Sequence, residues 1–318
     1  MALLLREDEV EALLDMPSVV GWVEESFRLL GEGRAVALPR QRVRLGRGTL
    51  HVLPAGSAEL GVLGLKSYTS FRGGTRFLVL LYSAESGELL ALVEARALGV
   101  ARTGAASGVA TRHLARPDAR VMAVFGAGAQ ARGQVEAVAC CHELDQVRVF
   151  SPTAERRERF AAEMSSRLDV AVVPCASPAE ALEGAGIVTT ITTSSRPVFE
   201  PEQLGEGVHI NAAGSNSLVR TEIDPRLVRD ARVVVDSRVQ AREEAGDLLL
   251  GAERGWLRWD TLIELGEIVA GRAPGRELPT QLTVFESQGL GIQDVAVAAR
   301  VYERAVERGV GRRVDVLT

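Results

Sequence analysis

The stretch that decides the fold of this chain runs Val121-Met122-Ala123-Val124-Phe125-Gly126-Ala127-Gly128-Ala129-Gln130-Ala131. Five apolar residues, as in a buried strand, lead directly into a G-x-G-x-x-A turn, and a helical pattern follows to about residue 142. The glycines permit a tight turn and the close approach of a pyrophosphate, which the free N–H groups of a helix N-terminus stabilise. A second strand at 147–150 completes the context that this motif requires. We therefore predict a dinucleotide cofactor that contacts Gly126, Gly128, Ala129 and Gln130.

Strands and helices continue to alternate beyond this unit. A helix is expected near 153–166, and short apolar strands are expected near 170–174, 186–192, 208–213 and 232–236. Short strands that are apolar throughout are typical of a parallel sheet with helices on both faces. The fold class predicted is α/β, with a Rossmann-type doubly wound parallel sheet over residues 117–289.

The first part of the chain has a different pattern. Residues 7–15 and 18–30 have apolar positions at helical spacing, and Gly-bearing turns separate the short strands that follow, near 41–45, 49–53, 61–68, 76–82 and 88–93. This pattern predicts an antiparallel meander. A helix rich in Ala, Gly and Ser is expected at 95–115, before Arg116-Pro117-Asp118 ends it. We expect a second, α+β domain over 1–116, to which a C-terminal helix within 290–318 returns.

Composition narrows the functional classes. The 318 residues carry a net charge of −5 and the arginines are dispersed among acidic residues, which argues against a nucleic-acid partner. No apolar run approaches the roughly 20 residues that span a bilayer, and the first residues lack a signal-peptide pattern, so we expect a cytoplasmic protein without a membrane partner. Three cysteines and four dispersed histidines show no metal-ligand spacing, and no metal is predicted.

Lys66 is the only lysine among 37 basic residues; all the others are arginine. Arginine stays protonated at any accessible pH, whereas a partly buried lysine can shift its pKa and exchange protons. The surrounding segment, Val62-Leu63-Gly64-Leu65-Lys66, is apolar and typical of a strand. We interpret the retained amine as a functional group, although a single surface lysine is the alternative.

The end of the second strand of the dinucleotide unit bears on the choice of cofactor. NAD-binding folds usually have Asp or Glu here, which accepts a hydrogen bond from the ribose 2′-hydroxyl, but this chain has Ser151. Thr153, Arg156 and Arg157 follow and are compatible with a phosphate, unless the arginines are simply solvated helix residues. NADP is therefore favoured, with NAD possible. Thr192, at the end of a later strand, is a further candidate cofactor contact.

Several motifs together resemble the ornithine cyclodeaminase and mu-crystallin family. Besides the glycine turn, the shared pieces are Leu38-Pro39-Arg40, His51-Val52-Leu53-Pro54-Ala55, Gly64-Leu65-Lys66, Ala101-Arg102-Thr103-Gly104-Ala105-Ala106-Ser107, His209-Ile210-Asn211-Ala212-Ala213-Gly214 and Gly246-Asp247. They span almost the whole chain. The resemblance implies a homodimer in which the N-terminal domain binds substrate and forms the dimer contact, beside a Rossmann domain.

The resemblance also implies a substrate and its binding residues. Family members act on the bond between Cα and nitrogen of a small amino or imino acid, and the family's carboxylate clamp matches Arg40, Lys66 and Arg102. Charge-assisted bonds to a carboxylate would aim the neighbouring Cα at a nicotinamide. Arg42 and Arg44 share the strand face of Arg40, so any of the three could be merely exposed. Thr103 resembles the family's nicotinamide or phosphate contact.

Two departures from the family's cyclodeaminases concern catalysis. Asn216 stands where those enzymes have an aspartate, and an amide can orient a substrate but cannot accept a proton. His51 stands where they have a glutamate, and a charged imidazole would repel a distal ammonium. The catalytic candidates are Lys66, His51 and Asn216. The leading hypothesis is an NAD(P)H-dependent reductase of a small imino acid, in reverse an amino-acid dehydrogenase; the alternatives are an ornithine cyclodeaminase and a non-catalytic ligand binder.

Overall fold

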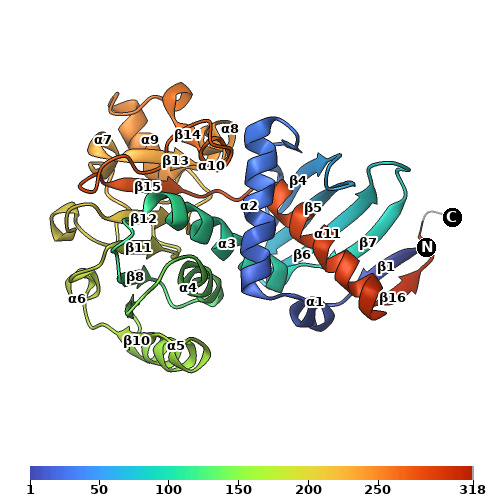
Figure 1. Ribbon diagram of the computed structural model, residues 1–318, viewed down its shortest axis with the longest axis horizontal. Helices are drawn as coiled ribbons and strands as arrows, with labels where there is room; N and C mark the ends of the chain where they lie inside the picture. Colours follow the sequence, from blue (N-terminus) through green and yellow to red (C-terminus); the bar gives the residue numbers. More distant parts are fainter. Residues whose placement is uncertain (317–318) are drawn as a thin grey trace. The chain divides into compact units, whose positions relative to one another are not determined.

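The structure is a computed structural model that describes residues 1–316. The chain forms two compact units (Figure 1). Unit 1 contains Met1–Arg102 and the segment from Gly289 onward, and unit 2 is Thr103–Gln288. Helix α3 (Arg96–Leu114) starts in the first and ends in the second.

Unit 2 is built on an eight-stranded sheet in which every pairing is parallel. Its strands are β8 (Val121–Phe125), β9 (Gln146–Phe150), β10 (Ala171–Pro174), β11 (Ile187–Thr190), β12 (His209–Ala212), β13 (Arg232–Val235), β14 (Ile263–Glu264) and β15 (Thr283–Glu286). Their order is β10-β9-β8-β11-β12-β15-β13-β14. The first five follow the doubly wound order, which reverses between β8 and β11 and places a ligand crevice outside the carboxyl ends of the strands. The predicted α/β fold class is confirmed.

Alternate residues of β8 point into two separate apolar cores. Ala123 and Phe125 belong to one core, while Met122 and Val124 belong to the other, so both faces of the sheet are covered. The helices of unit 2 besides α3 are α4 (Ala129–Cys141), α5 (Ala154–Arg167), α6 (Pro178–Leu182), α7 (Leu227–Asp230), α8 (Arg238–Glu244), α9 (Gly246–Glu253), α10 (Leu265–Val269) and the short 3-10 turns η1 (Pro201–Gln203) and η2 (Trp259–Thr261).

Unit 1 contains the meander that the sequence predicts, extended at both edges. Its strands are β1 (Ala2–Leu5), β2 (Val36–Ala37), β3 (Gln41–Leu45), β4 (Gly48–Ser57), β5 (Val62–Phe71), β6 (Gly74–Ser83), β7 (Leu89–Glu94) and β16 (Arg312–Val314). Strands β3 to β7 pair in sequence order and antiparallel. The terminal strands β1 and β16, which the sequence analysis did not anticipate, pair with one another, and β1 lies parallel to β7.

Helices cover one face of this sheet. They are α1 (Glu7–Leu13), α2 (Met16–Glu32) and α11 (Gly291–Arg308). Helix α11 crosses β4, β5 and β6, and α2 packs against it (Figure 1). Because successive side chains of a strand point to opposite faces of the sheet, every second side chain lies under α11 and the others lie on the opposite face. Lys66 belongs to the covered set, with its pairing partners Leu53 and Val79.

The division between the units differs from the expected boundary at residues 116 and 117. It falls after Arg102, because the rest of α3 packs on α4 in unit 2. A Cβ at Gly104 would overlap the backbone of Gly133, and one at Gly108 would crowd Ala137. The small residues of this helix thus permit the close backbone approach that the sequence indicates.

Candidate functional site

Lys66 lies on β5 beneath α11 and is only 2% exposed. Its Nζ donates to Oδ1 of Asp294, in the first turn of α11, over 2.7 Å. The rings of Phe77 and Tyr68 lie 5.3 and 6.0 Å from the same nitrogen. Burial lowers the pKa of Lys66 to about 8, and the attraction of Asp294 opposes part of this shift. The amine is therefore a titratable group near physiological pH.

Arg102 shares the same acceptor oxygen. Its Nε donates to Asp294 Oδ1 over 3.0 Å, and its Nη1 donates to Gln293 Oε1 over 3.0 Å. Asp294 is fully buried and is the point at which the lysine and the guanidinium meet. One carboxylate thus lies between two cations, which leaves the cluster with a net positive charge that suits an organic acid.

Glycines leave room for these long side chains. A Cβ at Gly99 would lie 3.2 Å from Lys66 Nζ, and a Cβ at Gly289 would overlap the guanidinium of Arg102. Gly289 also has φ +77°, which L side chains rarely adopt. The turn into α11 is therefore shaped around the clamp residues.

Arg40 is buried, in contrast to Arg42 and Arg44. It is 5% exposed, and its Nη2 lies 3.4 Å from the carbonyl oxygen of Gly289, the residue next to the Arg102 guanidinium. Arg42 is half-buried and Arg44 is exposed. All three predicted clamp residues thus come together in unit 1, and Arg40 is the one of the three alternating arginines that turns inward.

His51 lies on β4, on the same face as Lys66. Its ring stacks on Tyr68 with centroids 4.1 Å apart, and its Nε2 lies 3.2 Å from Ser70 Oγ. Burial and the guanidiniums of Arg42, Arg40 and Arg44 lower the pKa of His51 to about 4. The imidazole is therefore neutral near pH 7, so it can offer a hydrogen bond but not a positive charge.

The glycine turn of unit 2 fits a dinucleotide pyrophosphate. Gly126 has φ +118°, and a Cβ there would crowd the backbone of Ile191. A Cβ at Gly128 would point into open space, and within residues 1–316 no side chain caps the N-terminus of α4. Ala129 and Gln130 open this helix, so its first N–H groups point to where a phosphate would lie.

The predicted adenosine-side residues lie at the end of β9. Ser151 is buried at 8% exposure, and Thr153 is the N-cap of α5. Arg156 is exposed on that helix, whereas Arg157 turns back and donates from Nη1 to the Ser151 carbonyl over 3.1 Å. Arg157 is therefore bonded to the residue at the end of β9, whereas Arg156 is exposed.

Two of the remaining predicted residues of unit 2 follow other strands, and the third, Thr103, lies on α3. Thr192 comes after β11 and Asn216 after β12, both half-buried. Thr103 accepts at its carbonyl oxygen from Gln134 Nε2 over 3.3 Å. The turn, Ser151, Thr192 and Asn216 thus all follow the carboxyl ends of strands β8, β9, β11 and β12, the edge at which doubly wound sheets bind ligands.

Sequence reasoning missed two groups of residues. Asp294 was missed because an acidic residue in the first turn of a helix is commonplace, and only the fold brings it to Lys66. Glu222 and Asp247 are buried in unit 2, and only the Gly246-Asp247 pair had been noted, without a role. The signal for both was an acidic residue within an apolar or Gly-rich segment.

Among residues 1–316, no helix combines the length and the apolar character needed to cross a bilayer. Over the same residues, no group of three or more His, Cys, Asp or Glu is arranged to hold a metal ion.

The chain is similar to known proteins over nearly its full length. The sequence profile of the Ornithine cyclodeaminase/mu-crystallin family matches residues 2–309. A Delta(1)-pyrroline-2-carboxylate reductase of Bacillus cereus is 35% identical over 324 aligned positions, covering 98% of this chain and 99% of that protein.

Two solved structures are similar over nearly their full length. One is the Delta(1)-pyrroline-2-carboxylate reductase of Thermococcus litoralis in complex with NADH and L-proline, with a TM-score of 0.94, 34% identity and coverage of 98% of this chain and 100% of that one. The other is an archaeal alanine dehydrogenase dimer with bound NAD, with a TM-score of 0.92, 33% identity and 99% coverage of both chains.

Proposed function

Because this chain belongs to the ornithine cyclodeaminase and mu-crystallin family, we propose that it reduces the C=N bond of a small imino acid with a nicotinamide cofactor. Run in reverse, the reaction is that of an amino-acid dehydrogenase. The observation that carries the proposal is the buried meeting of Lys66 and Arg102 at Asp294, with Arg40 beside the same turn. Relatives named as pyrroline-2-carboxylate reductases support an imine substrate that bears a carboxylate.

In this proposal, Arg40 and Arg102 bind the substrate, and Lys66 transfers a proton to it. Arg40 and Arg102 bind the substrate carboxylate through charge-assisted hydrogen bonds and so fix the orientation of Cα. When bound, NAD(P)H would supply the hydride for the new C–H bond at Cα and would itself be oxidised to NAD(P)⁺. As the C=N π bond breaks, its electron pair goes to nitrogen, and Lys66 Nζ donates the proton that forms the N–H bond. The pKa of about 8 suits this proton transfer near neutral pH.

NADP is the proposed cofactor, with NAD as the alternative. The nicotinamide cofactor itself is supported by the glycine turn and by relatives with NADH or NAD bound. The choice of NADP rests on Ser151, which cannot repel a 2′-phosphate as a carboxylate would, and on the adjoining guanidinium of Arg157.

Ornithine cyclodeamination is the rival reaction, and two residues disfavour it. Asn216 cannot accept a proton, and the neutral ring of His51 provides no negative charge to hold a distal ammonium. For a cyclic imine such as pyrroline-2-carboxylate, neither function is needed.

A substrate comparison tests the proposal. Pyrroline-2-carboxylate with NADPH should give proline with one NADPH consumed for each proline formed. Ornithine should give no proline and no ammonia. Turnover of ornithine to proline and ammonia without net consumption of NADPH, combined with inertness toward imines, would reject the reductase assignment.

A homodimer is the proposed assembly, with a second copy on the face of the unit 1 sheet opposite α11. That face carries the exposed apolar side chains Val36, Val43, Leu45, Leu63 and Phe71, which are 46 to 75% exposed. A contiguous apolar surface on a sheet is typical of a protein contact. The dimeric alanine dehydrogenase relative supports the same state. We also propose the cytoplasm as the compartment, because three cysteines are too few for the disulfide framework that is typical of small secreted proteins.

A further inference from the structure

Glu222 joins the loops that follow two neighbouring strands of unit 2. Its carboxylate accepts from the backbone N–H of Thr192, after β11, and from the backbone N–H of Gly214, after β12, over 2.8 Å. It also accepts from the hydroxyl of Thr190, the last residue of β11, over 3.2 Å. The side chain is fully buried, and a Cβ at Gly214 would overlap it. A side chain at position 214 would therefore displace both the Glu222 carboxylate and the backbone of Thr192.

Asp247 holds Glu222 in turn. Its Oδ1 accepts from the backbone N–H groups of Glu222 and Ile223, the latter over 2.9 Å. The preceding residue, Gly246, begins α9 so close to Arg220 that a Cβ would overlap the Arg220 carbonyl oxygen. The Gly246-Asp247 pair thus anchors the segment that carries Glu222, which accounts for a motif that the catalytic clamp does not use.

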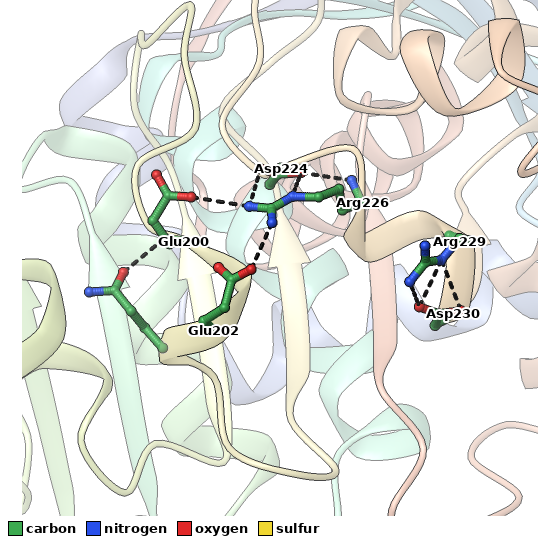
Figure 2. A network of polar contacts seen from close by, with 7 residues as sticks. Glu200, Glu202, Asp224, Arg226, Arg229 and Asp230 are labelled. Atoms are coloured by element: carbon green, nitrogen blue, oxygen red, sulfur yellow. Dashed lines mark hydrogen bonds and ion pairs between the residues drawn. The ribbon is translucent and has the colours of Figure 1, made fainter.

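A second, exposed connection lies further along the same segment. Arg226 donates to Asp224, Glu202 and Glu200, the last two at η1 in the loop after β11 (Figure 2). Exposed ion pairs contribute little to stability, because water and salt screen the attraction between the charges. The buried carboxylate is therefore expected to control the loop geometry, and the exposed network offers a matched control.

We propose that Glu222 is a positioning residue that shapes the nicotinamide half of the cofactor site. In a doubly wound fold, the two mononucleotide-binding halves bind the two halves of a dinucleotide. The half that contains β8 and β9 carries the glycine turn and Ser151, and the half that contains β11 and β12 carries Thr192 and Asn216. Glu222 holds both loops of that second half, since it bonds at Thr192 and at Gly214, two residues before Asn216. The inference rests on the proposed function.

The test compares binding of two ligands to Glu222→Gln. One ligand is NADPH, and the other is 2′-phospho-ADP-ribose, which has a hydroxyl group in place of the nicotinamide. An amide presents one acceptor oxygen where the carboxylate presents two, so the loops after β11 and β12 lose part of their shared acceptor. We expect the dissociation constant for NADPH to rise about tenfold, which corresponds to about 1.4 kcal/mol, and that for the fragment to stay within about twofold.

Two further variants complete the design. Arg226→Gln changes only the exposed network and should leave both dissociation constants near the wild-type values. Thr190→Val removes one donor to Glu222 with little change of shape, and should weaken NADPH alone to a smaller degree; it carries the test if Glu222→Gln does not fold.

The outcomes separate this inference from the proposed function. If both buried variants bind NADPH as the wild type does, or weaken the two ligands equally, Glu222 does not act on the nicotinamide half and the inference is overturned. If the wild type binds neither ligand, the proposed cofactor is wrong, and the inference falls with it.

Discussion

At the scale of the residue, the proposed chemistry depends on Lys66, the only lysine among 37 basic residues. Lys66 is buried beneath α11, where an arginine would also be charged but could not release a proton. We expect Lys66→Arg to lower the turnover of pyrroline-2-carboxylate about a hundredfold or more, since positioned general acids contribute that much. Binding of NADPH should be retained. Stopped-flow reduction and cofactor titration measure the two effects separately.

The same experiment distinguishes an enzyme from a non-catalytic binder. A binder would show cofactor affinity without turnover in the wild type, and the arginine variant would change affinity alone. Unchanged turnover in Lys66→Arg would remove the amine from the proton transfer.

Asp294 should control the pH at which Lys66 loses its proton. The carboxylate attracts the ammonium and so raises the lysine pKa against the effect of burial, Arg102 and Arg40. Without that charge the pKa falls further below about 8. A reaction that needs the ammonium is lost as pH rises through this pKa, so Asp294→Asn should move the basic limb of the kcat profile to lower pH.

A control for that profile is Asp8→Asn, which removes an exposed carboxylate from the same unit. Its profile should match the wild type. A basic limb that stays in place in Asp294→Asn would mean that Lys66 titration does not limit the rate.

The sequence predicted Lys66 and Arg102 as site residues, but not the buried carboxylate that both of them contact. The apolar setting of Lys66 and the small residues around Arg102 were visible in the chain. Asp294 was not, because its contact with Lys66 joins positions 228 residues apart. Glu222 was missed for the same reason: its acceptors and donors come from separate loops that only the parallel sheet brings together.

At the scale of the element, the strands with the plainest apolar pattern were predicted best. Strands β8, β9, β11, β12 and β13 all coincide with predicted apolar runs. Strand β15 was missed, although it lies between β12 and β13, because Thr283 and Glu286 give it polar ends. Helices α8 to α10 were missed because each is short, and most of their stability comes from packing instead of local propensity.

The loop between β9 and α5 should determine whether the enzyme prefers NADPH or NADH. Ser151→Asp would place a carboxylate where it accepts from a ribose 2′-hydroxyl and repels a 2′-phosphate. We expect the ratio of kcat/KM for NADPH to that for NADH to fall at least about tenfold, which corresponds to about 1.4 kcal/mol. Steady-state rates with each cofactor give the ratio. If the ratio does not change, the 2′ position of the cofactor is not near Ser151.

The whole molecule adds features that the periodicity of strands and helices does not predict. Periodicity predicts both sheets but not that the chain returns from unit 2 to complete unit 1, nor which sheet face stays uncovered. The register of β4 and β5 answers the second point, because residues 51, 53, 64 and 66 share the face under α11 and residues 50, 63 and 71 share the other.

That open face predicts the oligomeric state. Leu63→Asp, which introduces a charge into the apolar face, should convert a dimer to a monomer in sedimentation or light-scattering measurements. Leu278→Asp is the matched control, since Leu278 is 59% exposed and belongs to unit 2. A dimer that persists in the Leu63 variant would place the contact elsewhere.

The central claim is that the chain delivers a hydride to the Cα of a clamped imino acid, and isotope transfer tests it most directly. The enzyme would be incubated with NADPH dideuterated at nicotinamide C4 and with pyrroline-2-carboxylate, and the product analysed by mass spectrometry. We predict proline that carries one deuterium at Cα, with the label transfer strongly slowed in Lys66→Arg. Absence of deuterated proline from the wild-type reaction would contradict the account.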